Sequence, residues 1–257
     1  MEMSISILGV FVMLTSQSLE VFKMVMWTNV GKGRFPNTSI KSLTELIREM
    51  REKYLKGTTT IGITCADGIV LATDRRVTAG YYIAHKHGKK IYIVDSHVAV
   101  TVAGAVADAQ RLVDSLRVEA KLYKYEEERP ISIRSLATLA SNMLFNSRPF
   151  ILIVHMLLGG VDEVEGAVLY NVDWFGTITK ELYTATGSGY PVAIGILEEN
   201  YRKEMTTDEA IPLAVKAVRS AIMRDTGTGE GVDVAVVTKE GAKILSDSEV
   251  KEIMKKV

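Results

Sequence analysis

Residues 57–74 read GTTTIGITCADGIVLATD, and this stretch decides the fold. It contains two short runs rich in β-branched residues, TTTIGITC and IVLATD, on either side of an Asp67-Gly68 turn. Threonine, valine and isoleucine favour strands, and an Asp-Gly pair between two such runs is typical of a hairpin. The stretch therefore predicts an antiparallel hairpin at the start of a β-rich domain.

The patterns that follow extend this hairpin into strands and helices. Two more strand-like runs, KIYIV and HVAVTVAG, flank an Asp95-Ser96 turn, so four strands are expected before any helix. Apolar residues then recur at helical spacing over residues 105–123 and 133–144. These two patterns predict two helices that pack as neighbours.

The second half of the chain repeats this organisation. Its strand-like runs are ILIVHMLLGG, AVLYNVD, GTITK and ELYTAT. Helices are predicted over residues 190–201 and 206–221, the latter behind a Thr206/Glu209 capping box, and VDVAVVTKEGAKIL predicts a hairpin before a short charged helix. Strand runs followed by helix pairs, twice over, predict an α+β fold of two stacked antiparallel sheets covered by helices on both sides, an αββα sandwich.

Composition and charge exclude several classes of protein. The 257 residues include 31 lysines and arginines and 31 aspartates and glutamates, so no net charge steers the chain toward nucleic acid or an anionic membrane. The single cysteine, Cys65, excludes an internal disulfide and a zinc site of several thiolates. The four histidines show no metal-ligand spacing, so we expect neither a metal nor another cofactor.

Residues 1–57 are expected to form an N-terminal extension or propeptide before a domain over residues 58–257. The apolar run near residues 5–14 is too short for a membrane-spanning helix, and no positive charge precedes it as in a secretory signal peptide. A turn-rich stretch at residues 31–38 precedes a charged helix predicted over residues 42–54, which begins with a Ser42/Glu45 capping box.

Thr58 is a candidate nucleophile at this junction, within the sequence KGTTT. On the simpler interpretation these residues are only a turn glycine and strand threonines. On the functional interpretation, cleavage after Gly57 frees the α-amino group of Thr58, a base with an ordinary pKa of about 8, beside the hydroxyl of the same residue. Other chemistries lack their motifs: there is no GxSxG elbow, and the glycines of residues 227–231 follow a helix, the reverse of the nucleotide-binding order.

A carboxylate and an ammonium group favour the functional interpretation. Asp74 ends the second predicted strand and Lys90 begins the third, so both can lie at strand ends beside Thr58. On the simpler interpretation, Asp74 pairs with Arg76 at the edge of the sheet and Lys90 is solvated.

Six motifs taken together resemble the β subunits of the archaeal-type 20S proteasome, which are N-terminal nucleophile hydrolases. The motifs are GTTTIGI, ATDRRVT, HKHGKKIY, TVAGAVADAQ, TATGSGYP and RDTGTGEGVDVAVVT. They occur in the family's order from residue 57 to about residue 245 and do not extend to residues 1–56. The resemblance implies a threonine endopeptidase subunit, made as a zymogen that cleaves itself between Gly57 and Thr58.

The resemblance also assigns roles to residues. It implies that Thr58 is the nucleophile, that Lys90 lowers the pKa of its hydroxyl, and that Asp74 orients Lys90. Ser188 and Asp225 match the residues that hold the α-amino group and the catalytic water, although Ser188 could instead be only a helix N-cap.

Further assignments concern the oxyanion, the substrate pocket and one departure from the family. Gly104 matches the glycine whose backbone N–H forms the oxyanion hole, although a glycine in a strand-to-helix turn is the simpler interpretation. Thr228 stands where the family usually has serine, and its extra methyl is expected to misaim a hydrogen bond near the amine and slow the subunit. The residues implied to line an uncharged pocket, and so to favour cleavage after apolar residues, are Val77, Gly88, Tyr92, Val102 and Val106.

The partners follow from the same resemblance. It implies seven-membered rings with other β subunits, contacts with α subunits, a regulatory ATPase on the α rings, and unfolded protein substrates in the cytoplasm, with no nucleic acid and no membrane. An unprocessed or weakly active structural β subunit is the alternative function, and a separate small-amide hydrolase is a third. Because short propeptides are typical of the family, Met50 is an alternative start that would leave residues 50–57 as the propeptide.

Overall fold

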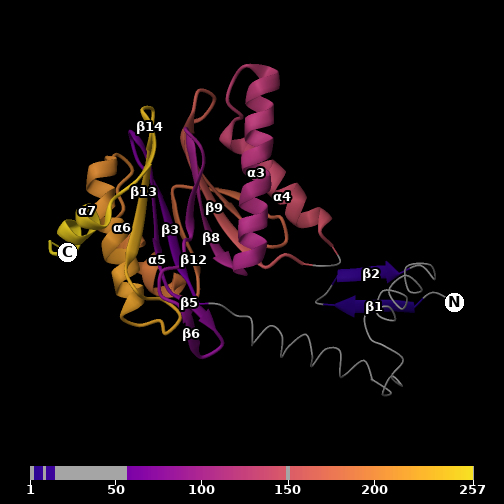
Figure 1. Cartoon of the computed structure of the whole chain (residues 1–257), viewed down its shortest axis with the longest axis horizontal. Coiled ribbons are helices and arrows are strands. Elements are labelled where there is room, and N and C mark those ends of the chain that lie inside the picture. Colours follow the sequence, from indigo (N-terminus) through magenta and orange to yellow (C-terminus); the bar gives the residue numbers. More distant parts are fainter. Residues whose placement is uncertain (1–2, 8–9, 15–56, 149–150, 257) are drawn as a thin grey trace. The chain divides into compact units, whose positions relative to one another are not determined.

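The computed structural model describes residues 3–7, 10–14, 57–148 and 151–256 (Figure 1). Contacts divide the chain into two units, Met1–Met50 and Arg51–Val257. In the first unit, β1 (Met3–Ile7) and β2 (Val10–Leu14) form an antiparallel hairpin. The turn-rich stretch at 31–38 and the helix predicted over residues 42–54 lie outside the described residues, and the domain boundary after Gly57 stays a prediction.

Two five-stranded antiparallel sheets form the centre of the second unit. The first sheet, in the order β11-β10-β9-β8-β7, consists of β7 (Ile91–Asp95), β8 (Val98–Gly104), β9 (Val154–Asp162), β10 (Gly166–Val172) and β11 (Ile178–Glu181). The second, in the order β12-β3-β4-β13-β14, consists of β3 (Thr59–Thr64), β4 (Gly68–Asp74), β12 (Tyr183–Gly187), β13 (Val232–Thr238) and β14 (Gly241–Ile244).

Helices cover the outer faces of both sheets (Figure 1). The first sheet packs against α3 (Val106–Glu127) and α4 (Ile133–Asn146). The second packs against α5 (Tyr190–Asn200), α6 (Thr207–Ile222) and α7 (Asp247–Met254). The predicted αββα sandwich is therefore confirmed, as is the Thr206/Glu209 capping box of α6. In the part of the chain that the structure describes, no helix has the length and apolar character to span a membrane.

Strand β4 shows why the sequence produces these layers. It is the central strand of its sheet and is buried along its whole length. Ile69 and Leu71 point into the core between the sheets, whereas Val70 and Ala72 join the core under the helices. Since successive side chains of a strand alternate between faces, an unbroken apolar run is what a strand covered on both faces requires.

One hairpin of the domain was not predicted from the sequence. Four strands were expected before the first helix of the domain, but β5 (Val77–Ala79) and β6 (Tyr82–His85) form an additional two-stranded sheet there. These strands are three and four residues long, and most of β6 is exposed. The hairpin therefore lacks the apolar alternation by which a half-buried strand is recognised.

Strand pairing gathers the candidate residues at one end of the sandwich. Thr59 is paired with Gly187 and Asp74 with Val232, so the start of β3 lies near the ends of β4 and β12 and the start of β13. In the other sheet, Gly104 ends β8 and Lys90 directly precedes β7.

Candidate active site

The Thr58 hydroxyl faces the peptide bond that precedes it. Thr58 directly precedes β3, and only 3% of the residue is exposed. Its Oγ1 donates a hydrogen bond to the carbonyl oxygen of Gly57 at 2.6 Å, and its backbone N–H donates to Ser188 Oγ at 3.1 Å. The candidate nucleophile therefore lies beside the carbonyl group that self-cleavage requires.

Gly57 is held where no side chain would fit. Its N–H donates to Thr78 Oγ1 at 2.8 Å. A Cβ atom at this position would lie 2.0 Å from the Cα of Gly227, which is far inside van der Waals contact. Glycine before Thr58 is therefore a packing requirement of this site.

Asp74 and Lys90 form a buried ion pair beside Thr58. Lys90 Nζ donates to Asp74 Oδ1 at 2.7 Å, and Asp74 also accepts backbone N–H bonds from Thr59, Arg76 and Gly229 at 3.0, 3.0 and 2.9 Å. Burial lowers the pKa of Lys90 from its usual value, and the negative charge of Asp74 only partly opposes this effect.

The simpler interpretation of these charged residues is wrong. Lys90 is 6% exposed rather than solvated. The Arg76 guanidinium donates to Glu230 Oε1 at 3.2 Å and to the Thr226 carbonyl oxygen at 2.8 Å. Arg76 is therefore bound to the loop before β13 and does not form the expected edge pair with Asp74.

A second hydrogen-bonded group joins Ser188 to Asp225. Ser188 Oγ donates to Asp225 Oδ2 at 2.5 Å while it accepts the N–H of Thr58. Gly189 is the N-cap of α5, so the interpretation of Ser188 as only a helix cap is wrong. Ser188 therefore links the backbone nitrogen of Thr58 to a carboxylate.

Thr228 completes this group through contacts that the sequence did not indicate. Its hydroxyl donates to Asp225 Oδ2 at 2.5 Å and lies 2.7 Å from Thr59 Oγ1, and both threonines are fully buried. The hydrogen bonds of Thr228 thus run to Asp225 and Thr59 rather than directly to Thr58.

Gly104 adopts a conformation that favours glycine. Its φ angle is +118°, and a Cβ atom there would lie 2.1 Å from the carbonyl oxygen of Ile153. Gly104 lines the same cavity as Thr58, and Ala105 after it is the N-cap of α3.

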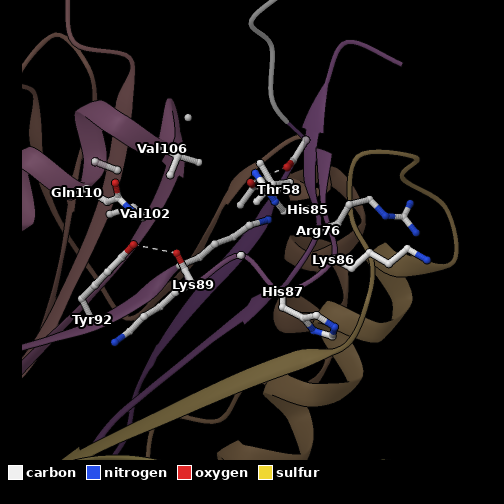
Figure 2. Close-up of a pocket in the computed structure, with 16 residues that line it drawn as sticks. Thr58, Arg76, His85, Lys86, His87, Lys89, Tyr92, Val102, Val106 and Gln110 are labelled. Atoms are coloured by element: carbon white, nitrogen blue, oxygen red, sulfur yellow. Dashed lines mark hydrogen bonds between the residues drawn. The ribbon is translucent and has the colours of Figure 1, made fainter. Parts of the chain in front are cut away.

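A cavity of about 410 Å³ opens beside Thr58 and contains the predicted substrate-pocket residues (Figure 2). The five residues Val77, Gly88, Tyr92, Val102 and Val106 all line it. Ala109 and Gln110 from α3 extend the lining. The structure thus brings the pocket residues together with Thr58, Lys90 and Gly104 around one space. Basic side chains also line this space, so the cavity as a whole is not the uncharged pocket that was expected.

Several contacts at the site have no sequence motif of their own. Thr59, Thr78 and the Arg76–Glu230 pair were not singled out as functional, although each touches a candidate residue or its loop. Glu230 has a φ of +68°, unusual for a residue with a side chain. Among the described residues, no group of three or more His, Cys, Asp and Glu side chains is placed to hold a metal ion.

Comparison with known proteins places the chain in a family. The proteasome subunit family matches residues 54–237. "Proteasome subunit beta 1" of Pyrobaculum aerophilum is 57% identical over 198 residues, which cover 77% of this chain and 98% of that protein. "Proteasome subunit beta 2" of Nitrosopumilus maritimus is 45% identical over 205 residues, which cover 80% and 97%.

The chain therefore belongs to the proteasome subunit family. Both of these relatives are archaeal β subunits, so the family's peptidase role and its assembly with other proteasome subunits apply to this chain.

Proposed function

We propose that this chain is a threonine endopeptidase subunit of the proteasome core particle, which degrades unfolded proteins to peptides in the cytoplasm. One observation carries the proposal: the Thr58 hydroxyl lies 2.6 Å from the Gly57 carbonyl oxygen, and Lys90, which is paired with Asp74, lines the same cavity as Thr58. A nucleophile, a carbonyl group and a buried lysine that can exchange a proton are elements that acyl transfer uses.

The first reaction is the removal of the residues before Thr58. Lys90 in its neutral amine form accepts the hydroxyl proton as Thr58 Oγ1 attacks the Gly57 carbonyl carbon, and it passes this proton to the Thr58 nitrogen as the C–N bond breaks. Water then hydrolyses the resulting ester, which yields a Gly57 carboxylate and restores the Thr58 hydroxyl. The product carries a free α-amino group next to its own nucleophile.

The second reaction uses the same oxygen on a substrate. The α-amino group of Thr58 accepts the hydroxyl proton, since an α-amine with an ordinary pKa near 8 is a suitable base at neutral pH. Ser188 and Asp225 hold this nitrogen, and the Gly104 N–H stabilises the oxyanion. The α-amino group then passes this proton to the substrate nitrogen as the scissile C–N bond breaks, which leaves an ester of Thr58 with the substrate's acyl group. Water hydrolyses this ester and restores the Thr58 hydroxyl.

The proposed partners are those of a ring-shaped core particle. They are α subunits, neighbouring β subunits in a seven-membered ring, and a regulatory ATPase that acts through the α ring. The intact mass of this chain in the assembled particle tests the proposed function: Thr58 as the first residue supports it. Retention of the residues before Thr58 would instead favour a structural β subunit.

We predict a preference for apolar residues before the scissile bond. Part of the cavity is apolar and is lined by Val77, Tyr92, Val102 and Val106. Burial of an unpaired charged side chain there would cost about 2 kcal/mol or more. Fluorogenic peptides with leucine or an aromatic residue there should be cleaved about tenfold faster or more than those with arginine or glutamate. Faster turnover of the arginine peptide, by particles in which this is the sole β subunit, would contradict the pocket assignment.

A pair of variants at Thr228 tests the hydroxyl network. Thr228→Ala removes a hydrogen-bond partner from both Asp225 and Thr59. Loss of one buried hydrogen-bonding group costs about 1 to 3 kcal/mol, so turnover should fall by roughly tenfold to a hundredfold. Thr228→Ser keeps the hydroxyl and removes only the methyl, so its turnover should equal or exceed that of the parent. A serine variant as slow as the alanine variant would show that the methyl, not the hydroxyl, is what the site needs.

A further inference from the structure

Basic side chains surround the mouth of the cavity, and the reactions described above do not use them. His85, Lys86, His87 and Lys89 are exposed and line the cavity that contains Thr58. We call these four residues the basic rim. Among the described residues that line the cavity, none is an aspartate or glutamate. The mouth therefore has a positive excess although the whole chain is balanced in charge.

Nearby carboxylates do not neutralise the rim. Asp74 is paired with Lys90, and Glu230 is paired with Arg76. Asp247 is close enough to respond to the charge of His87, but its carboxylate contacts Arg75. In the ranges that the structure describes, no carboxylate forms an ion pair with Lys86 or Lys89, and the Lys89 ammonium lies 5.3 Å from the centroid of the Tyr92 ring.

Gly88 fixes the rim next to the proposed nucleophile. Its N–H donates to the carbonyl oxygen of Arg75 at 2.8 Å, and a Cβ atom there would lie 2.2 Å from Val77 Cγ2. This close approach holds the segment that carries the rim against the strand end that supplies Asp74.

Part of the basic rim lies across Thr58 from the apolar lining, whereas Lys89 lies beside Tyr92. Figure 2 shows Lys86 and His87 on one side of Thr58, and Val102, Val106 and Gln110 on the other. A peptide whose apolar side chain occupies the second side must extend its flanking residues past the first.

We propose that the basic rim makes this subunit prefer substrates that carry acidic residues on either side of the scissile bond, with an apolar residue still directly before it. The inference rests on the proposed function and specifies its substrate class. Each exposed ion pair contributes little, but several charges of one sign at a cleft raise the local concentration of oppositely charged segments.

Three matched peptides test the preference in assembled particles. Each is internally quenched and has leucine before the scissile bond, and the positions flanking the leucine and the bond carry glutamate, glutamine or lysine. At low ionic strength we expect kcat/KM for the glutamate peptide to exceed that for the lysine peptide by about tenfold, and high salt should reduce this ratio because it screens exposed charges. Equal rates at low ionic strength would overturn the inference.

Two charge-reversing variants locate the effect. Lys86→Glu should lower the glutamate-to-lysine ratio at least threefold. Lys239→Glu makes the same charge change in the turn between β13 and β14, outside the cavity lining, and should leave the ratio unchanged. An equal fall in both variants would assign the preference to overall charge and overturn the role of the rim. Cleavage without charge preference would refute this inference alone, whereas failure to cleave any peptide would refute the proposed function and this inference with it.

Discussion

Replacement of Thr58 by alanine is expected to lower peptidase turnover by at least about a thousandfold and to leave the preceding residues attached. The substitution removes Oγ1, the atom that contacts the Gly57 carbonyl group, but keeps the backbone N–H that Ser188 accepts. Both proposed reactions need this one oxygen, so both should fail together. Fluorogenic peptide assays and the intact mass of the chain in purified particles measure the two effects separately.

Thr58→Ser is the matched control for this experiment. It keeps a hydroxyl at the same position and should be processed and active, whereas the alanine variant should be neither. If the alanine variant were still cleaved after Gly57 in particles without another active β subunit, self-cleavage by Thr58 would be wrong.

Much of the fold could be predicted because burial leaves a direct pattern in the sequence. The apolar run of β4 and the helical spacing of Leu112, Val113 and Leu116 in α3 both mark faces that pack into a core. The β5–β6 hairpin could not be recognised in this way, because β5 has only three residues and most of β6 is exposed. An element that buries little apolar surface leaves little periodicity to detect.

The candidate site could likewise be predicted only in part. Asp74 and Lys90 could be placed near Thr58 because each stands at the end of a predictable strand. The contact between Thr59 and Thr228 depends on the conformation of the loop before β13, where Glu230 and Gly231 both have positive φ angles. No local pattern encodes how such a loop returns to a distant strand, so these contacts become visible only in the folded structure.

Lys90→Met is expected to lower self-cleavage by about a hundredfold or more, because proton transfer by a positioned side chain typically contributes 10²–10⁴-fold. Peptidase turnover should fall as well, because the charge that favours the alkoxide-like state of Thr58 is lost. Methionine keeps most of the side-chain length but removes the ammonium group. Asp74 would still accept three backbone N–H bonds, so we expect the variant to fold and assemble. Circular dichroism and native mass check the fold, and Lys239→Met is a control for loss of a lysine outside the cavity lining.

Lys90→Arg separates a role in charge from a role in proton transfer. Arginine keeps the positive charge beside Asp74, but its guanidinium stays protonated and cannot accept the hydroxyl proton. If Lys90 is the base in self-cleavage, the arginine variant should be processed as slowly as the methionine variant. Processing at the parent rate would show that the positive charge alone is sufficient.

The pH dependence of self-cleavage gives the sharpest test of Lys90. Before cleavage the Thr58 nitrogen is in a peptide bond, so its later titration as an amine does not contribute. Because burial lowers the pKa of Lys90, the processing rate should rise with pH through an apparent pKa below 10.5. Between the lowered pKa of Lys90 in the folded chain and the ordinary lysine pKa of 10.5 in the unfolded chain, the unfolded chain binds more protons at Lys90. Rising pH therefore also favours the folded state in this range.

Asp74→Asn should move this apparent pKa further down, because it removes the negative charge that opposes the effect of burial. The measurement is the initial rate of precursor cleavage, followed by mass after purified precursor is mixed with α subunits at a series of pH values. We expect the apparent pKa to be highest for free lysine, lower for the parent and lowest for the asparagine variant. An upward shift in the asparagine variant would mean that the titrating group is not Lys90, since loss of a neighbouring negative charge makes protonation of an amine less favourable.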